Sequence, residues 1–246
     1  ISPYNKKPPR CCYRDGFFYF SIMTVSKLKV LTPTTGRCFI LGEANQKVNT
    51  LWMVLHGYGQ SASDFIQNFS DLADDNTLVA APEGLHRFYL KSTRGKVGAS
   101  WMTKEEREDD IRNNIQYLNQ TLGQLVEKTT PDIHIIVVGF SQGAPTAFRW
   151  AAQLDQNISM LISWGSDIPA DVLSDPIGLD KINRSNTHLV VGSQDQYITE
   201  ERLYNHLHDL DNAECAYDLI SYNGDHSIHT ETLRFLLKKL EGELFD

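Results

Sequence analysis

A serine stands between two glycines at residues 139–143, which read G-F-S-Q-G. This G-x-S-x-G pattern is typical of a strand that turns sharply into a helix, because glycines two positions before and after leave room for the turn. The same turn places the backbone N–H of Gln142 at a helix N-terminus, where partial positive charge can stabilise a developing oxyanion. The pattern therefore predicts a nucleophile at Ser141 and an oxyanion donor at Gln142.

A serine hydroxyl is a weak nucleophile until a base removes its proton, and the base needs an acid to orient it. After a G-x-S-x-G serine, the expected order along the chain is serine, acid, histidine. Asp195 follows a predicted strand at residues 187–191, and His226 follows another at 216–221. We therefore predict a catalytic triad of Ser141, Asp195 and His226.

Two alternatives stay open for the acid and the base. Asp167 also follows a predicted strand, and His229 lies just beyond His226. His229 adjoins the helix expected from about residue 230, where a capping or surface role fits better. Asp225 cannot easily turn back onto the neighbouring imidazole and is interpreted as a loop residue. The other histidines weighed fall within a predicted helix or near strand starts at the opposite end of the sheet: His206, His208, His134 and His188.

A second oxyanion donor is predicted in the loop at residues 56–60, which reads H-G-Y-G-Q. The loop follows a continuous apolar strand at 50–55. Its two glycines let backbone N–H groups turn outward, and Tyr58 is the donor expected in this architecture. The dipeptide His-Gly carries little weight alone, but the preceding strand and the downstream Ser141 strengthen it.

The elements that position these residues alternate between strand and helix along the chain. The β-branched run at 135–138 predicts a buried parallel strand, and apolar residues spaced by three and four from 147 to 154 predict a helix. Pro145 falls near the first turn of that helix, where its missing N–H does least harm. Further strands are expected at 78–82, 158–163, 187–191 and 216–221, and further helices around 61–73, 111–125, 203–210 and 233–240.

This alternation predicts a single α/β domain, with a mostly parallel central sheet and helices on both faces. Residues 27–31 and 38–41, joined by the turn sequence P-T-T-G at 33–36, predict an N-terminal antiparallel hairpin. Residues 83–104 show no clean period and hold several aromatic residues, so a binding loop, a lid or a simple packed loop are all open. The acidic run at 105–110 is interpreted as the start of a solvated helix and not as a metal site.

Composition limits the possible functions. The chain has 246 residues, 41% of them hydrophobic, and a formal net charge of −8, with an excess of positive charge in residues 1–22. An acidic body without a basic stripe argues against nucleic-acid binding, and no apolar run is long enough for stable membrane insertion. Residues 1–22 are expected to be a disordered or extraneous extension, and 23–246 a single domain. The extension faintly resembles a secretory signal, but a chain that starts at Met23 is the preferred interpretation.

The four cysteines show neither metal-ligand spacing nor the density of a disulfide scaffold. They are Cys11, Cys12, Cys38 and Cys215. Reduced surroundings are the simpler interpretation, so a cytoplasmic location is expected, with secretion left open.

Taken together, five motifs resemble those of the phospholipase/carboxylesterase family of α/β hydrolases, which includes the acyl-protein thioesterases. The motifs are H-G-Y-G-Q at 56–60, G-A-S-W at 98–101, G-F-S-Q-G at 139–143, G-S-Q-D at 192–195 and G-D-H at 224–226. The resemblance runs from about residue 27 to the end, and it implies the α/β-hydrolase fold and the same triad and oxyanion donors. It also implies that Trp101 lies near the acyl pocket and contacts substrate. Ala144, Gln60 and Thr199 depart from the family's common residues, which bears on substrate choice more than on chemistry.

The expected function is a serine esterase of the carboxylesterase or lysophospholipase type, which works through an acyl-enzyme and needs neither metal nor organic cofactor. An acyl-protein or acyl-CoA thioesterase is the alternative with the same chemistry, so the expected partner is a small-molecule acyl ester or thioester. A non-catalytic ligand-binding protein is the alternative of another class, since fold does not fix function. A homodimer is left open.

Overall fold

The computed structural model describes residues 25–245, so the expectations for residues 1–22 lie outside it. The chain falls into two units, with the boundary between Pro33 and Thr34. In the first unit, the described residues 25–33 contain neither helix nor strand.

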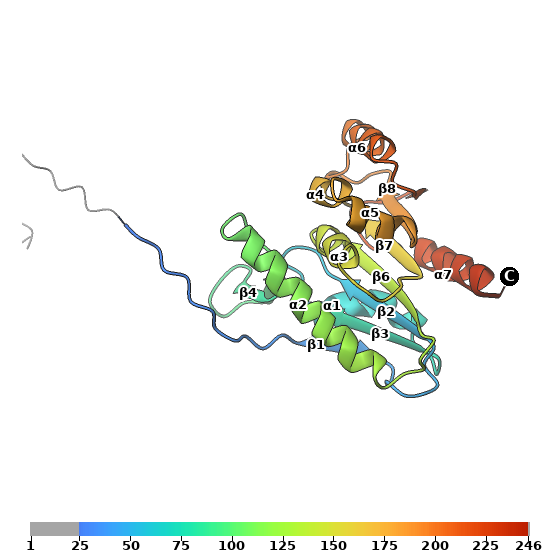
Figure 1. The fold of residues 1–246 in the computed structure, drawn as a ribbon, viewed down its shortest axis with the longest axis horizontal. Helices are drawn as coiled ribbons and strands as arrows, with labels where there is room; N and C mark the ends of the chain where they lie inside the picture. The colour runs from blue at the N-terminus through green and yellow to red at the C-terminus, as the bar shows by residue number, and fades with distance from the viewer. Residues whose placement is uncertain (1–24, 246) are drawn as a thin grey trace, which may run out of the picture. The chain divides into compact units, whose positions relative to one another are not determined.

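A seven-stranded sheet forms the centre of the second unit (Figure 1). In spatial order its strands are β1 (Cys38–Leu41), β3 (Thr77–Pro82), β2 (Thr50–Leu55), β6 (His134–Phe140), β7 (Met160–Trp164), β8 (Asn186–Gly192) and β9 (Asp218–Tyr222). Only β1 is antiparallel to its neighbour, and every other pair is parallel. The predicted, mostly parallel α/β sheet is confirmed.

Helices cover both faces of the sheet. They are α1 (Ala62–Phe65), the 3-10 helix η1 (Ile66–Leu72), α2 (Arg107–Val126), α3 (Gly143–Ala151), α4 (Ala170–Leu173), α5 (Pro176–Asn183), α6 (Glu200–Asn212) and α7 (Thr230–Phe245). Side chains alternate across a strand. On β2, Leu51 and Met53 therefore join a core with α2 and α3, whereas Trp52 and Val54 join a second core with η1 and α7. No helix in residues 25–245 is both long and apolar enough to cross a membrane.

The hairpin predicted at the N-terminal end is wrong in its pairing. Residues 27–31 form no strand. Residues 38–41 pair instead with β3, with Cys38 opposite Pro82 and Leu41 opposite Val79. An isolated two-stranded hairpin is marginal in water, whereas pairing with the edge of a formed sheet adds a ladder to an existing core.

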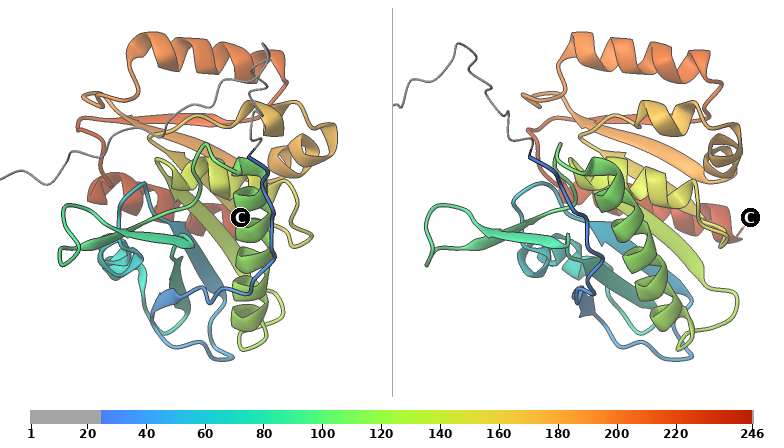
Figure 2. Two further views of the ribbon diagram at one scale, coloured as in Figure 1. Left: turned by 90° about the vertical axis from the view of Figure 1, so that its left-hand side faces the viewer. Right: turned by 60° about the vertical axis from the view of Figure 1, so that its left-hand side comes forward.

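An antiparallel hairpin is present elsewhere, in the stretch that was expected to be irregular. It consists of β4 (His86–Tyr89) and β5 (Val97–Ser100), with Tyr89 opposite Val97. Figure 2 shows it extending away from the central sheet. The expected helix after Ser61 is also shorter than predicted, because α1 makes a single turn before the chain continues as η1.

One histidine is buried in the sheet away from the residues that line the cavity described below. His188 on β8 is 1% exposed, and neither ring nitrogen hydrogen-bonds to any described residue. The carboxylate of Asp218 lies 3.6 Å from its Nδ1, and the charge of Lys239 also acts on the ring. Burial lowers the pKa of His188 to about 4, because the imidazolium would lose its hydration.

We predict that His188 makes the fold acid-sensitive. Its pKa is lower in the folded than in the unfolded chain, so the unfolded chain binds the proton first as pH falls from about 6.5 towards 4. The free energy of unfolding should therefore drop by roughly 2 kcal/mol more between pH 7 and 5 in the wild type than in His188→Leu. Urea unfolding at the two pH values measures this difference. An equal drop in both proteins would contradict the prediction.

Candidate active site

The turn between β6 and α3 holds Ser141 in a backbone conformation that side chains rarely adopt, with φ at 51°. No larger residue fits on either side of it. A Cβ at Gly139 would lie 2.3 Å from the Cα of Ala144, and one at Gly143 would lie 2.1 Å from the carbonyl oxygen of Leu55. Both glycines of the motif are therefore required by close backbone approach, and the strand–turn–helix context predicted for Ser141 is present.

Asp195 and His226 meet at the ends of neighbouring strands. Asp195 follows β8 and His226 follows β9, and the Nδ1 of His226 lies 2.6 Å from the Oδ2 of Asp195. The carboxylate is 1% exposed, and its other oxygen accepts hydrogen bonds from the backbone N–H groups of Tyr197 and Ile198 at 2.8 and 3.2 Å. With both oxygens occupied, the carboxylate has one orientation. We assign the imidazole proton to Nδ1, which leaves Nε2 as an acceptor.

The imidazole of His226 is enclosed by aromatic rings and a glycine. The ring of Phe140 packs against it at 4.8 Å, and Tyr197 meets it edge-on at 4.7 Å. Gly165, with φ at +64°, lies beneath the ring, where a Cβ would come within 2.9 Å of the imidazole. The ring therefore has little freedom to rotate away from Asp195.

Two residues missed by the sequence analysis fix the loop that carries His226. The indole Nε1 of Trp164, the last residue of β7, donates to the carbonyl of Ser227 at 3.0 Å. The hydroxyl of Tyr222, the last residue of β9, lies 2.6 Å from the same oxygen. Burial raises the pKa of Tyr222, so the phenol stays a donor. Their position at the carboxyl ends of strands was the available signal.

The loop that follows β2 is organised by its own polar side chains. His56 is fully buried, and burial lowers its pKa, so the ring is neutral. Its Nε2 accepts from the backbone N–H of Gly84 at 3.0 Å, and its Nδ1 lies 2.8 Å from the carbonyl of Gly57. The Oε1 of Gln60 accepts from the N–H of Gly57 at 2.7 Å. Within residues 25–245, the N–H groups of Tyr58 and Gln142 donate to no acceptor.

Trp101 lies buried beside the two donor loops. It is 0% exposed and is not among the residues that line the cavity at Ser141. Its indole donates to the carbonyl of His56 at 2.8 Å, and its backbone N–H donates to the Oε1 of Gln142 at 3.1 Å. The Nε2 of Gln142 in turn donates to the carbonyl of Met102 at 2.9 Å. Trp101 therefore joins the two donor loops from within the core, and its expected contact with substrate stays a prediction.

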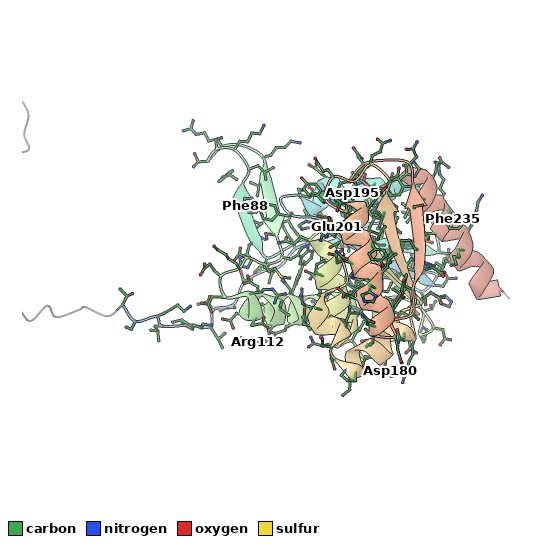
Figure 3. All side chains as sticks on the ribbon, turned by 90° about the horizontal axis from the view of Figure 1, so that it is seen from above. Phe88, Arg112, Asp180, Asp195, Glu201 and Phe235 are labelled. Atoms are coloured by element: carbon green, nitrogen blue, oxygen red, sulfur yellow. The ribbon has the colours of Figure 1, made fainter. Side chains whose placement is uncertain are left out.

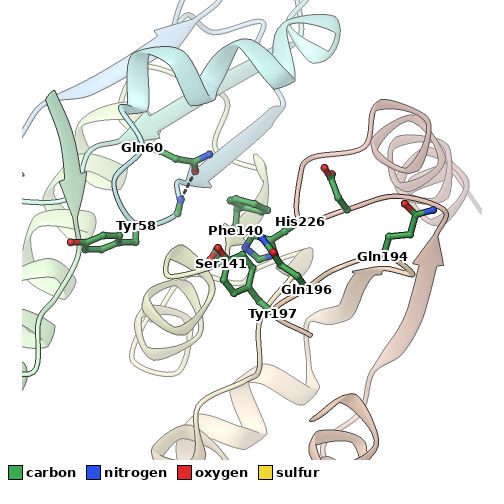
Figure 4. A pocket seen from close by; sticks show the side chains of 10 residues that line it. Tyr58, Gln60, Phe140, Ser141, Gln194, Gln196, Tyr197 and His226 are labelled. Atoms are coloured by element: carbon green, nitrogen blue, oxygen red, sulfur yellow. Dashed lines mark hydrogen bonds between the residues drawn. The ribbon is translucent and has the colours of Figure 1, made fainter. Parts of the chain in front are cut away.

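A cavity of about 670 Å³ opens over Ser141 and His226 (Figure 4). Its walls combine aromatic rings with carboxamides and one carboxylate. The lining residues are Gly57, Tyr58, Gln60, Phe140, Ser141, Gln194, Gln196, Tyr197, Asp225 and His226. The predicted nucleophile Ser141, the predicted base His226 and the donor residue Tyr58 thus line one cavity, and Asp195 hydrogen-bonds to His226.

The alternative residues have other partners. The carboxylate of Asp167 pairs with Arg202 at 2.8 Å. His229 accepts from the backbone N–H of Thr232 at 3.3 Å, which is the capping role expected for it. Asp225 accepts from the hydroxyl of Ser227 at 2.6 Å, and no described residues group in a way that would hold a metal ion.

Comparison with solved structures shows a shared fold. Esterase PE8 is 21% identical, with a TM-score of 0.62 over 84% of this chain and 100% of the other. Acyl-protein thioesterase 2 of Zea mays is 19% identical, with a TM-score of 0.62 over 85% and 100%. A phospholipase/carboxylesterase from Dyadobacter fermentans is 17% identical, with a TM-score of 0.60 over 85% and 98%.

No curated protein sequence matches the chain significantly. The model of the phospholipase/carboxylesterase family, however, matches residues 37–243, which is most of the chain. That span includes the turn at Ser141, the Asp195–His226 pair and the loop at Tyr58. The chain is therefore an α/β hydrolase that belongs to the phospholipase/carboxylesterase family.

Proposed function

We propose that the chain is a serine esterase that hydrolyses carboxylic esters through an acyl-enzyme. The observation that carries this proposal is the 2.6 Å hydrogen bond between His226 and the buried Asp195, in the cavity that also holds Ser141 at its strained turn. Ser141 and the oriented imidazole of His226 line the same cavity, and a serine hydroxyl within reach of such a base is the arrangement that activates a serine nucleophile.

Acylation begins when the Nε2 of His226 takes the proton of Ser141, whose oxygen attacks the ester carbonyl. Negative charge develops on the carbonyl oxygen, where the free N–H groups of Tyr58 and Gln142 receive it. Asp195 accepts the Nδ1 proton in a hydrogen bond and stabilises the imidazolium. The imidazolium then protonates the departing alkoxide, and the alcohol leaves Ser141 acylated.

Deacylation repeats these steps with water as the nucleophile. His226 removes a proton from water, the hydroxide attacks the acyl-enzyme, and the carboxylic acid leaves as Ser141 regains its proton. A thioester follows the same route with a thiol as leaving group, so the acyl-protein or acyl-CoA thioesterase alternative uses the same residues. Every step uses protein groups and water.

We predict that Ser141→Ala abolishes hydrolysis of p-nitrophenyl acetate, with a fall in kcat of at least about 10⁴-fold, because no other group can form the acyl-enzyme. A fluorophosphonate probe should label the wild type and not the variant. Alanine at a positive φ adds no bulk, so thermal unfolding should stay near that of the wild type. Equal rates in the two proteins would favour the non-catalytic alternative.

Asp195→Asn should lower kcat by roughly 10³–10⁴-fold, because the amide cannot hold the imidazole in the tautomer that leaves Nε2 free. Asp167→Asn is the matched control, since Asp167 also follows a strand but pairs with Arg202. The kcat of Asp167→Asn should stay within about threefold of the wild-type value, because only an exposed ion pair is lost. Steady-state kinetics on p-nitrophenyl acetate compares the two, and the reverse ranking would assign the acid to Asp167.

Gln60→Leu should lower kcat by about tenfold to a hundredfold with little change in KM, because the side chain that fixes the Gly57 N–H is lost and the Tyr58 donor is no longer held in place. Gln196→Leu is the control, since Gln196 lines the same cavity without bonding to that loop. It should change KM more than kcat. Similar kinetics in both variants would show that Gln60 does not organise the oxyanion loop.

A further inference from the structure

The β4–β5 hairpin concentrates positive charge on an acidic protein. Its tip, residues 86–97, contains Arg87, Lys91, Arg94 and Lys96 and no acidic residue, whereas the whole chain has a net charge of −8. All four cations are exposed. Lys96 lies 3.9 Å from Asp64 across open solvent, and the other three form no ion pair with a described residue. Three of the four cations are therefore available to an external anion, and the fourth, Lys96, is paired only across an exposed contact.

Apolar side chains are exposed on the same tip. Tyr89, Leu90 and Val97 are 53%, 46% and 38% exposed. The tip is an ordered turn, in which the N–H of Leu90 donates to the carbonyl of Lys96 at 3.0 Å. Figure 3 shows the hairpin, labelled at Phe88, standing out from the helices and the sheet. The outermost part of this element is therefore both cationic and apolar.

The hairpin is joined rigidly to the oxyanion loop. The N–H of Gly59 donates to the carbonyl of Ala99 at 2.8 Å, and the N–H of Ala99 donates to the carbonyl of Gln60 at 3.0 Å. The ring of Phe88 packs against Tyr58 at 5.4 Å. Since Tyr58 also lines the cavity, whatever binds the hairpin lies beside the entrance to the site.

We propose that the β4–β5 hairpin docks the protein on an anionic lipid surface, with Tyr89 and Leu90 in the interfacial layer and Lys91, Arg94 and Lys96 on lipid headgroups. Tyrosine and leucine beside basic residues match the chemistry of that interface, where an aromatic ring and a cation both find partners. An acidic protein would satisfy the cations but leaves the exposed apolar side chains without a role.

The acidic body does not prevent this docking. Repulsion between exposed charges decays over a Debye length of about 8 Å at physiological ionic strength. Because the hairpin projects from the sheet, its cations reach the surface before the body does. Docking should therefore weaken as salt rises. It does not require hydrolysis, so it stands or falls independently of the proposed esterase activity.

The test is co-sedimentation of the full chain with phosphatidylcholine vesicles that contain about one third phosphatidylserine, compared with vesicles of phosphatidylcholine alone. Each Lys or Arg near such a surface strengthens binding roughly fivefold. We expect the wild type to partition at least about tenfold more strongly onto the anionic vesicles, and Lys91→Glu/Arg94→Glu to lose at least about tenfold of that partitioning. The double variant should keep its thermal unfolding temperature.

A matched control carries the same change in charge at exposed lysines outside the hairpin. Lys47 precedes β2, and Lys128 follows α2. The oxyanion loop follows β2 and the hairpin precedes α2, so both lysines lie at the ends of these elements that face away from the hairpin. The Lys47→Glu/Lys128→Glu variant should retain most of the vesicle binding. An equal loss in both double variants would overturn the proposal, because net charge and not the hairpin would then govern binding. Absence of wild-type binding, or equal binding to neutral vesicles, would overturn it too.

A second variant separates lipid from an acidic protein. Tyr89→Ser/Leu90→Ser keeps every cation and should lower binding to the anionic vesicles severalfold, while leaving any binding to soluble poly-glutamate unchanged. Binding to vesicles that is insensitive to this variant, together with equally strong binding to poly-glutamate, would assign the hairpin to an acidic protein and contradict a lipid surface.

Discussion

The close approach of two backbones at the end of β6 is the constraint on which the site depends. Residue 143 lies so near the carbonyl of Leu55 that only glycine fits, and Ser141 must then turn through a positive φ. A strained residue of this kind costs about 1–3 kcal/mol. Hydrogen bonds around it offset part of that cost, since the N–H of Ser141 donates to the carbonyl of Trp164 at 2.9 Å. The strain is what lifts the hydroxyl into the cavity.

The parallel sheet brings the other groups to the same place. The carboxyl ends of β2, β6, β7, β8 and β9 lie at one edge, and each is followed by a segment that contributes to the site. Trp164 and Tyr222 are examples, because each is the last residue of its strand and each donates to the carbonyl of Ser227, the residue after His226. Side chains that never meet a substrate thus set the orientation of those that line the cavity.

The sequence predicted the sheet, its main helices and the family because their signals are local. Apolar runs mark the buried parallel strands, and the spacing of Ile111, Ile115 and Leu118 marks α2. Pairing and packing are not local, and there the predictions were wrong. Residues 27–31 have strand-like composition but form no strand, and β4 and β5 pair within a stretch whose composition shows no clean period. Trp101 is held by bonds to the distant residues His56 and Gln142, which no local pattern reveals. The roles assigned to Ser141, Asp195 and His226 stay a proposal.

Gln142 joins parts of the molecule that are usually considered separately. Its backbone follows Ser141 directly, while its side chain accepts from the hydroxyl of Ser100 and the N–H of Trp101 and donates to the carbonyl of Met102. Ser100 ends β5, so the carboxamide of Gln142 links the nucleophile turn to the hairpin through hydrogen bonds. If residues 86–102 were grafted onto a relative, the hairpin would keep its position against the nucleophile turn only if the relative also had a glutamine at the position of Gln142. Hairpin and nucleophile turn therefore form one module for engineering, although some forty residues of chain separate them.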